Sequence, residues 1–407
     1  MHISNLLCAV ALHAIVSAFP NVPFVTSGQW VHDSTGENFT YVGANWPGAG
    51  EVMIPEGLQY QSIASIASNI KSLNMNAVRL TFAIEMIDDI KDNGGDVTIQ
   101  DAFNKALGDT NGTAVYQKVI ENNPQFGPST TRLQVYDAIA AELEKQQIYV
   151  HLDNHMSKGK WCCSTNDGNA WFGDADFDVA KWKRGLQYMA EHGKQWPNMV
   201  SIGLRNEFRK PDVAGSSLPY DWPTWYEQNI AAADVVNSAN PDILIFLSGL
   251  NFDTTLQPIP WADDLGNGTK FLLTDFKYAD KLVLEMHNYQ NSATSCGDIE
   301  GGLWNNGFRA TGEKAVNRMP VLLTEFGFTQ ADSSYNGVYA TCLRKLMPQW
   351  KSGWMVWALG GSYYIRTGTQ DYEETWGLLN HDWSAWRNSD AIEALKSMVD
   401  ATLASVQ

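Results

Sequence analysis

The chain has 407 residues, 44% of them hydrophobic, which suits two ordinary domains or one large barrel with a sizeable core. Its 28 basic residues are outnumbered by 45 acidic ones, and the net charge is −17. Because such a charge repels phosphate backbones and anionic lipid, the composition argues against nucleic-acid and membrane partners and favours a neutral ligand.

The first 18 residues are typical of an export signal. An apolar run covers residues 6–16, and Val16-Ser17-Ala18 provides the small residues that a signal peptidase needs. The run is too short to span a bilayer comfortably, and no later stretch reaches the ~20 apolar residues of a membrane helix. We therefore expect a secreted protein whose mature part, residues 19–407, is one domain. Three glycosylation triplets agree with export, beginning at Asn38, Asn111 and Asn267.

Removal of the signal would take away Cys8 and leave four cysteines. An even number in an oxidising compartment predicts two disulfides. Because the Cβ vectors of neighbouring residues diverge, we expect Cys162 and Cys163 to bond to Cys296 and Cys342, in an order that the sequence leaves open. A zinc site is the competing interpretation, but the chain lacks a Cys-x-x-Cys motif and paired histidines.

Apolar, β-branched runs alternate with helical patterns along the mature chain, which predicts parallel βαβ units. Eight runs can be counted, at 39–46, 77–82, 149–155, 199–207, 243–247, 282–289, 320–327 and 353–359. The clearest helical stretches lie at 129–147, 178–196, 223–240 and 333–350, followed by a final helix at 389–403. This pattern predicts an α/β fold, a single (β/α)₈ TIM barrel, although a doubly wound open sheet has the same alternation.

Two long loops are expected, at 83–128 after the second strand and at 156–177 after the third. In a barrel such loops cover the carboxyl end of the strands, where active sites lie. The second loop contains Trp161-Cys162-Cys163. We expect both loops to shape a binding cleft.

Two of the predicted strands carry a glutamate at or near their carboxyl end. The fourth run ends in Arg205-Asn206-Glu207, and the seventh in Glu325-Phe326-Gly327. A carboxylate aimed into the barrel mouth is costly unless it is paired or takes part in chemistry, and strands four and seven would face each other there. Glycoside cleavage needs such a pair, one protonated and one ionised. A salt bridge between Glu207 and Arg79 is the structural alternative.

Other strand ends carry residues with a role available beside such a pair. Asn206 can bind a sugar 2-hydroxyl, and Arg79 and Tyr289 can hold Glu325 ionised and oriented. The charge of Glu325 would raise the pKa of Glu207 and keep it protonated. Histidines can bind hydroxyls, and tryptophan can stack on a sugar ring. The remaining residues of this kind are His155 on strand three, His287 on strand six and Trp357 on strand eight.

This ordered set, from Arg79 to Trp357, resembles glycoside hydrolase family 5, within a clan of retaining (β/α)₈ glycosidases. The resemblance covers residues 19–407 and implies a catalytic domain with Glu207 as acid/base and Glu325 as nucleophile. It also implies no metal, no cofactor and a β-linked carbohydrate as the partner. We expect the protein to be a monomer.

The resemblance implies a cellulase-like activity, and we expect internal cleavage of a β-1,4-glucan. Phe208-Arg209 follows Glu207 where many family cellulases have proline, so β-mannan, β-1,3- or β-1,6-glucan, galactan and exo-acting cleavage stay open. A serine hydrolase would need a Gly-x-Ser-x-Gly elbow, which is absent. A barrel that binds carbohydrate without cleaving it would lack one glutamate. Candidate sugar platforms are Trp46, Trp161 and Trp171, then Trp304 and Trp376.

Overall fold

The computed structural model describes residues 19–212, 217–266 and 268–407. The predicted export signal at 1–18 lies outside the described residues, as does Asn267 of the third glycosylation triplet. Asn38 and Asn111, which begin the other two triplets, are exposed.

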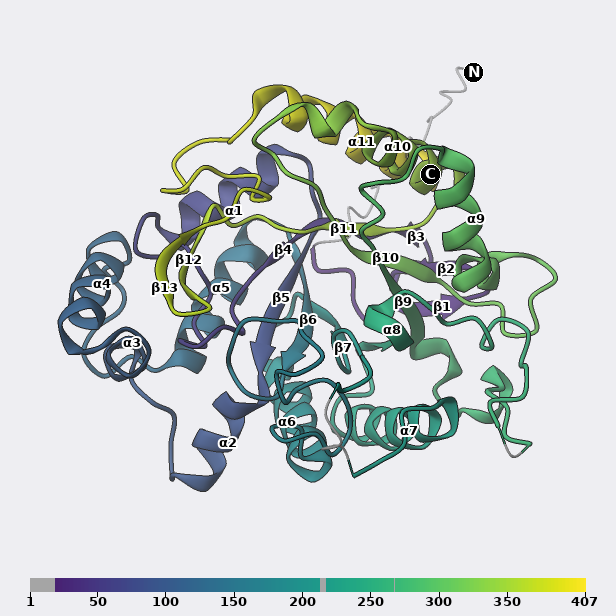
Figure 1. Ribbon diagram of the computed structural model, residues 1–407, viewed down its shortest axis with the longest axis horizontal. Helices are drawn as coiled ribbons and strands as arrows, with labels where there is room; N and C mark the ends of the chain where they lie inside the picture. Colours follow the sequence, from purple (N-terminus) through teal and green to yellow (C-terminus); the bar gives the residue numbers. More distant parts are fainter. Residues whose placement is uncertain (1–18, 213–216, 267) are drawn as a thin grey trace, which may run out of the picture.

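Eight parallel strands, each paired with the next in chain order, form a closed barrel at the centre of the molecule (Figure 1). This confirms the predicted (β/α)₈ architecture, and each predicted run overlaps one barrel strand. The strands are β4 (Val42–Trp46), β5 (Ala77–Ala83), β6 (Tyr149–Met156), β7 (Met199–Gly203), β8 (Leu244–Ser248), β9 (Leu282–Asn288), β10 (Val321–Phe326) and β11 (Trp354–Val356).

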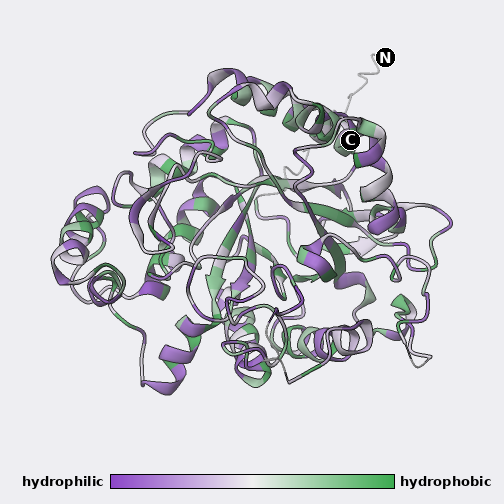
Figure 2. Cartoon of the chain, viewed as in Figure 1, coloured by the Kyte–Doolittle hydropathy of each residue, from purple (hydrophilic) through white to green (hydrophobic). Residues whose placement is uncertain are grey.

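Every residue of these eight strands is buried. Side chains on one face fill the barrel, and those on the other face meet the surrounding helices. A strand buried on both faces has a continuous apolar run rather than an alternating one, which is why the runs could be recognised. Figure 2 shows hydrophobic residues along strands such as β5 and hydrophilic residues on peripheral helices such as α2 (Ile84–Asp92).

Helices surround the barrel between successive strands. The five predicted helices are confirmed as α5 (Arg132–Lys145), α6 (Val179–His192), α7 (Trp222–Ala239), α10 (Val338–Trp350) and α11 (Ser389–Ser405). Besides the helices of the connection between β5 and β6, the further helices are α1 (Ile63–Ser72), α8 (Leu250–Asp253) and α9 (Cys296–Asn306). Within the described ranges, no helix combines the length and apolar character needed to cross a membrane.

A three-stranded antiparallel sheet covers the amino-terminal end of the barrel. It consists of β1 (Val25–Ser27), β2 (Trp30–His32) and β3 (Asn38–Phe39). Phe39 packs edge-on against Tyr41 and Tyr149, with ring centroids 5.0 and 5.2 Å apart. The predicted first run at 39–46 therefore spans the end of this sheet and the first barrel strand, which begins at Val42.

The segment 83–128 is not an open loop as predicted, because it contains three helices. After α2 come α3 (Ile99–Leu107) and α4 (Asp109–Asn122). The side chain of Thr98 caps α3 by accepting a hydrogen bond from the backbone N–H of Asp101, and the helix buries Phe103. None of residues 83–128 lines the main cavity, so this segment does not shape the cleft directly.

A β-hairpin that the sequence analysis did not predict follows β11. Its strands are β12 (Ser362–Arg366) and β13 (Thr369–Glu373). Phe103 of α3 packs against Tyr364 of β12 with ring centroids 4.9 Å apart, and Gln370 donates a hydrogen bond to the carbonyl of Leu107. The three-helix segment thus supports the hairpin from outside, and the hairpin in turn lines the cavity.

The loop at 156–177 is confirmed, but the predicted disulfide pairing is wrong. Cys162 bonds to Cys163, and Cys296 bonds to Cys342. The physical reason is location: the adjacent pair lies in the loop after β6, over the carboxyl end of the barrel. Cys296 begins α9 and Cys342 lies in α10, two neighbouring helices outside the barrel, with Cα atoms 5.3 Å apart.

The two disulfides should contribute very differently to stability. Cys296–Cys342 joins residues 46 positions apart, and loop-closure entropy predicts a stabilisation of roughly 4 kcal/mol. Cys162–Cys163 joins residues 1 position apart and restrains almost none of the unfolded chain. We expect C296A/C342A to lose up to about 4 kcal/mol of unfolding free energy, and C162A/C163A less than about 1 kcal/mol. Urea unfolding measures both, and equal losses would contradict the argument.

Candidate active site

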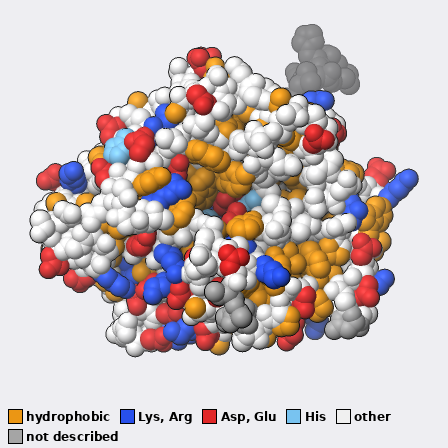
Figure 3. All heavy atoms as spheres, in the orientation of Figure 1, with side chains coloured by type: hydrophobic (Ala, Val, Ile, Leu, Met, Phe, Trp, Pro, Cys, Tyr) orange, Lys and Arg blue, Asp and Glu red, His pale blue; other side chains and the backbone are white. Residues whose placement is uncertain are grey.

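The main cavity lies at the carboxyl end of the barrel and has a volume of about 490 Å³. In Figure 3 it is the hollow near the centre of the face, with acidic and histidine side chains at its floor and hydrophobic side chains around it. Most of the predicted site residues line it. The lining consists of His155, Trp161, Cys162, Cys163, Asn206, Glu207, Tyr289, Glu325, Trp357, Arg366, Tyr372, Glu373, Glu374, Thr375 and Trp376.

Glu325 is held by one residue of β5 and one that follows β9. It lies near the carboxyl end of β10, and its side chain is only 5% exposed. Arg79 of β5 donates to Oε1 at 2.5 Å, and the hydroxyl of Tyr289 donates to Oε2 at 2.8 Å. Each oxygen therefore has a donor of its own. These two bonds orient the carboxylate toward the cavity and stabilise its negative charge.

The fully buried guanidinium of Arg79 joins several groups beneath the cavity floor. Besides Glu325, it contacts Asp153 of β6 at 3.0 Å and donates to the Asn206 Oδ1 at 2.8 Å. Burial alone would raise the pKa of Asp153, but the charge of Arg79 outweighs it and lowers the pKa to about 2. Asp153 in turn accepts a hydrogen bond from His155 Nδ1 at 2.7 Å. One cation thus orders the nearby carboxylates.

Glu207 lies beyond the end of its strand, because β7 ends at Gly203 rather than at the predicted residue 207. Its φ is +48°, in the left-handed region that non-glycine residues rarely adopt. Two buried side chains hold this backbone. Asp253 accepts a hydrogen bond from the Glu207 N–H at 2.8 Å, and Arg209 donates to the Glu207 carbonyl at 2.8 Å.

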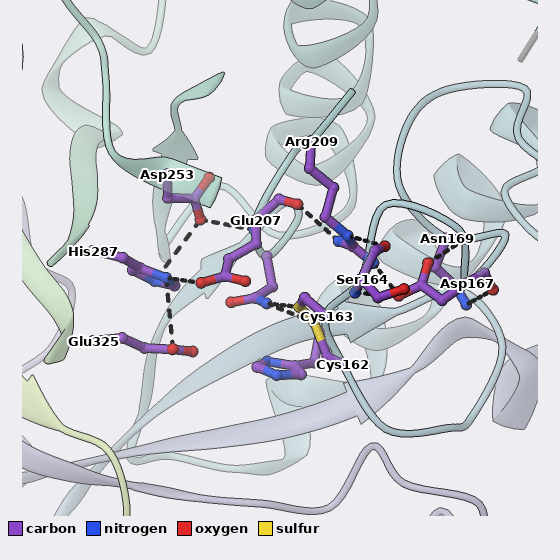
Figure 4. Close-up of a disulfide and its surroundings, with 12 residues drawn as sticks. Cys162, Cys163, Ser164, Asp167, Asn169, Glu207, Arg209, Asp253, His287 and Glu325 are labelled. Atoms are coloured by element: carbon purple, nitrogen blue, oxygen red, sulfur yellow. Dashed lines mark hydrogen bonds and ion pairs between the residues drawn. A yellow bond between two sulfur atoms is a disulfide. The ribbon is translucent and has the colours of Figure 1, made fainter. Parts of the chain in front are cut away.

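His287 lies between the two glutamates, as Figure 4 shows. Its Nδ1 is 3.1 Å from Oε1 of Glu207 and 3.6 Å from Oε2 of Glu325. Burial lowers the pKa of His287 to about 3, so the ring is neutral at ordinary pH. A proton on Nδ1 would allow it to donate to either carboxylate.

The two glutamates meet across the mouth of the barrel. Glu207, His287 and Glu325 each contribute one atom to a group whose members all lie within 4.8 Å of one another. Burial raises the pKa of Glu207, against the opposing charges of Arg209, His155 and Arg79. A carboxyl group whose pKa is raised by burial therefore lies beside one that is hydrogen-bonded to Arg79.

The same three atoms are close enough to surround a metal ion. Arg79 already places a positive charge 2.5 Å from Glu325, and a second cation there would be repelled. The group suits hydrogen bonding and proton transfer better than metal binding.

Only some of the tryptophans predicted to stack on sugar rings line the cavity. Trp357 lines the cavity and stacks on His155 with ring centroids 5.3 Å apart, and Trp376 also lines it. Trp161 forms part of the wall, but the guanidinium of Arg366 lies 3.6 Å from its ring centroid and covers one face. Trp304 is 37% exposed on α9, away from this cavity.

Trp46 and Trp171 are not platforms, and this expectation is corrected. Both are fully buried. Trp46 donates its indole N–H to the carbonyl of Glu56, and Trp171 donates to the carbonyl of Pro219. Because each ring is enclosed by core residues and its polar atom is satisfied within the protein, neither face can meet a sugar.

The sequence analysis missed two parts of the site. Asp253, which holds the backbone of Glu207, follows the fifth barrel strand and could have been noticed as a polar residue after an apolar run. The β12–β13 hairpin and the segment just after it supply Arg366, Tyr372, Glu373, Glu374 and Thr375 to the cavity wall. No strand-like alternation marked these residues.

Comparison with known proteins agrees with this geometry. The family model described as cellulase, glycosyl hydrolase family 5, matches residues 32–362. A glycosyl hydrolase 5 family protein of Chamaecyparis obtusa is 33% identical over 407 residues, covering 97% of this chain and 69% of that protein. The chain belongs to glycosyl hydrolase family 5. It is therefore a glycoside hydrolase.

Solved structures share the fold of this glycosyl hydrolase family 5 protein. An endocellulase from Pyrococcus horikoshii, in complex with cellotetraose, superposes with a TM-score of 0.68 at 16% identity, over 93% of this chain and 98% of that one. The catalytic domain of the major endoglucanase from Xanthomonas campestris pv. campestris gives 0.67 at 17% identity, over 93% and 99%. At such identities the likeness concerns the barrel.

Asp253 should be needed to hold the Glu207 backbone. Burial raises its pKa well above the usual range, and the charges of Glu285 and Glu207 add to the effect. We expect Asp253→Ala to lower kcat about 100-fold and the unfolding free energy by about 1–3 kcal/mol. Asp253→Asn keeps an acceptor and should retain most activity. Steady-state kinetics test this, and equal losses in both variants would contradict it.

Proposed function

We propose that this protein hydrolyses β-glycosidic bonds with retention of configuration, with Glu325 as the nucleophile and Glu207 as the acid/base. The observation that carries the proposal is the spacing of the two glutamates, whose nearest oxygens lie within 4.8 Å. Retaining enzymes place their carboxyl groups ~5–5.5 Å apart, whereas inverting enzymes need ~6.5–9.5 Å to admit a water molecule between acid and base.

In the first step, a carboxylate oxygen of Glu325 attacks the anomeric carbon of the bound sugar. The bond from that carbon to the glycosidic oxygen breaks, and Glu207 gives its proton to the departing oxygen. The products are a glycosyl ester on Glu325 and an ionised Glu207. In the second step, Glu207 takes a proton from water, and the hydroxide oxygen displaces Glu325 from the same carbon.

The surrounding residues serve these steps through their contacts. Arg79 and Tyr289 stabilise the Glu325 carboxylate before attack and after release. Asn206, fixed by Arg79, presents its amide to the cavity, where it can bind a sugar 2-hydroxyl. Trp357 offers an aromatic surface on which the sugar ring can stack.

As substrate we propose a β-1,4-glucan cut internally. The match to a family model described as cellulase supports this, as does the fold shared with endocellulases. One observation favours exo-acting cleavage as a second candidate: Arg366 covers one face of Trp161 and forms an ion pair with Glu374 at 3.0 Å. Such a contact at the cavity wall would shorten the row of sugar platforms.

We also propose that the protein acts outside the cell as a monomer, after removal of residues 1–18. The apolar run at 6–16 and two disulfides support export, because disulfides persist in oxidising compartments. The exposed Asn38 and Asn111 are accessible for glycosylation.

The Glu325→Gln variant should lose turnover by more than about 10⁴-fold while keeping its fold. Glu207→Gln should lose about 10²–10⁴-fold on substrates with a poor leaving group, but should still react with a dinitrophenyl glycoside, which needs no proton. Intact mass spectrometry of that reaction should show one sugar attached to the chain at Glu325. Product NMR should show the retained anomer first.

An exposed glutamate of α4 provides a matched control, since Glu121→Gln makes the same chemical change outside the cavity. Near-wild-type rates for Glu325→Gln, or an inverted first product, would remove Glu325 from the nucleophile role.

The substrate proposal predicts a ladder of oligosaccharides from soluble β-1,4-glucan. Incubation with β-1,4-glucan, β-mannan, β-1,3- and β-1,6-glucan, galactan and aryl glycosides, followed by chromatography of the products, tests it. Glu325→Gln protein purified in parallel controls for contaminating enzymes. Release of a single small sugar would identify exo action instead, and activity confined to another polymer would reassign the substrate.

A further inference from the structure

The Cys162–Cys163 disulfide lies in the wall of the active site. Both cysteines line the cavity beside Glu207 and Asn206. Figure 4 shows the sulfur–sulfur bond of Cys162 and Cys163 on the side of the cavity where Glu207 lies. A bridge between adjacent residues restrains almost none of the unfolded chain, so stabilisation of the fold does not account for it.

The disulfide contacts Asn206 through both sulfur atoms. The Asn206 Nδ2 lies 3.5 Å from Sγ of Cys162 and 3.5 Å from Sγ of Cys163. On its other side, Oδ1 accepts a hydrogen bond from Arg79 at 2.8 Å. Because Arg79 can only donate and sulfur is a weak acceptor, the two contacts fix which way the amide points.

The same bridge lies against Glu207. The two sulfur atoms and one carboxylate oxygen of Glu207 all lie within 4.8 Å of one another. A disulfide carries no charge and solvates a carboxylate poorly, so it takes the place of water on this side of the carboxyl.

The loop that carries the bridge is tied to the backbone of Glu207. Arg209, which donates to the Glu207 carbonyl, also donates to the Ser164 carbonyl at 2.7 Å and to Asp167 Oδ2 at 2.5 Å. The guanidinium of Arg209 therefore fixes the segment after Cys163 relative to the backbone of Glu207.

We propose that the Cys162–Cys163 disulfide is a positioning element of the catalytic site, which fixes the amide of Asn206 and excludes water from one side of the Glu207 carboxyl. This inference rests on the proposed role of Glu207 as acid/base. It assigns no redox step to the bridge, which remains oxidised throughout the reaction.

The electrostatics agree with this geometry. Burial is the largest influence on Glu207 and raises its pKa, although nearby cations oppose the shift. If water entered where the bridge lies, Glu207 would be less buried while the nearby cations stayed in place. The pKa of Glu207 would therefore fall. The charged and titratable groups that face Glu207 are Arg79 from β5, Asp153 and His155 from β6, Arg209 after β7, Asp253 from α8, His287 and Tyr289 at β9, and Glu325 from β10.

The test is the pH profile of kcat/KM for C162A/C163A, measured on the substrate found active in the panel above. The alkaline limb reports the free enzyme's acid, Glu207. We expect this limb to move to lower pH by roughly 0.5–1 unit, and kcat at neutral pH to fall about 3–10-fold, because the smaller side chains admit water. The C162S/C163S variant should shift in the same direction and replaces the alanine variant if that variant does not fold.

The second disulfide provides the matched control. C296A/C342A removes a bridge of the same chemistry outside the cavity, so its alkaline limb should stay in place even as its unfolding free energy falls. An unchanged limb and kcat in both vicinal variants, or a change in KM alone, would overturn the proposal. Alkylation of Cys162 or Cys163 in unreduced protein, read by peptide mass spectrometry, would also overturn it.

Failure of the proposed function has a different signature. If Glu207 is not the acid/base, Glu207→Gln retains the alkaline limb and the turnover of the parent protein. A profile in which Glu207→Gln removes the limb and C162A/C163A leaves it unmoved rejects the role of the disulfide alone.

Discussion

The site depends on the ion pairs that the buried guanidinium of Arg79 forms with Asp153 and Glu325. This guanidinium pairs with Asp153 of β6 and Glu325 of β10, and it is fully buried from solvent. Buried carboxylates of this kind are tolerated only when they are paired and hydrogen-bonded. A cation in this position therefore allows a barrel floor to carry several acids, and it also sets the orientation of Asn206.

The two glutamates are held by different parts of the fold. Glu325 belongs to β10 and takes its partners from β5 and from the residue that follows β9. Glu207 lies beyond the regular part of β7, with a left-handed backbone that Asp253 and Arg209 hold in place. The position of Glu325 is thus built by the barrel, and the position of Glu207 by its loops. The vicinal disulfide belongs to the second group.

Sequence patterns predicted the barrel well, because strands buried on both faces are apolar along their length and polar residues at their ends stand out. The same reasoning failed for side chains outside that pattern. The sequence around a tryptophan such as Trp171 does not show whether its ring is buried, because burial depends on the residues that pack around it in the fold. The pairing of Cys162 was predicted wrongly because the divergence of adjacent Cβ vectors is a local property, whereas the separation of Cys162 from Cys296 and Cys342 is set by the fold.

The sequence by itself determined the alternation of eight strands with helices and indicated the family, because apolar runs and the order of strand-end residues are properties of the chain, whereas the closure of the barrel was decided by the tertiary structure. The sequence also indicated the glutamate pair, since charged residues after apolar runs are costly without a role. Only the tertiary structure decided how close Glu207 and Glu325 lie, what holds the left-handed backbone, and which side chains wall the cavity. These features arise from contacts between segments far apart in the chain, and local residue patterns contain no information about such distances.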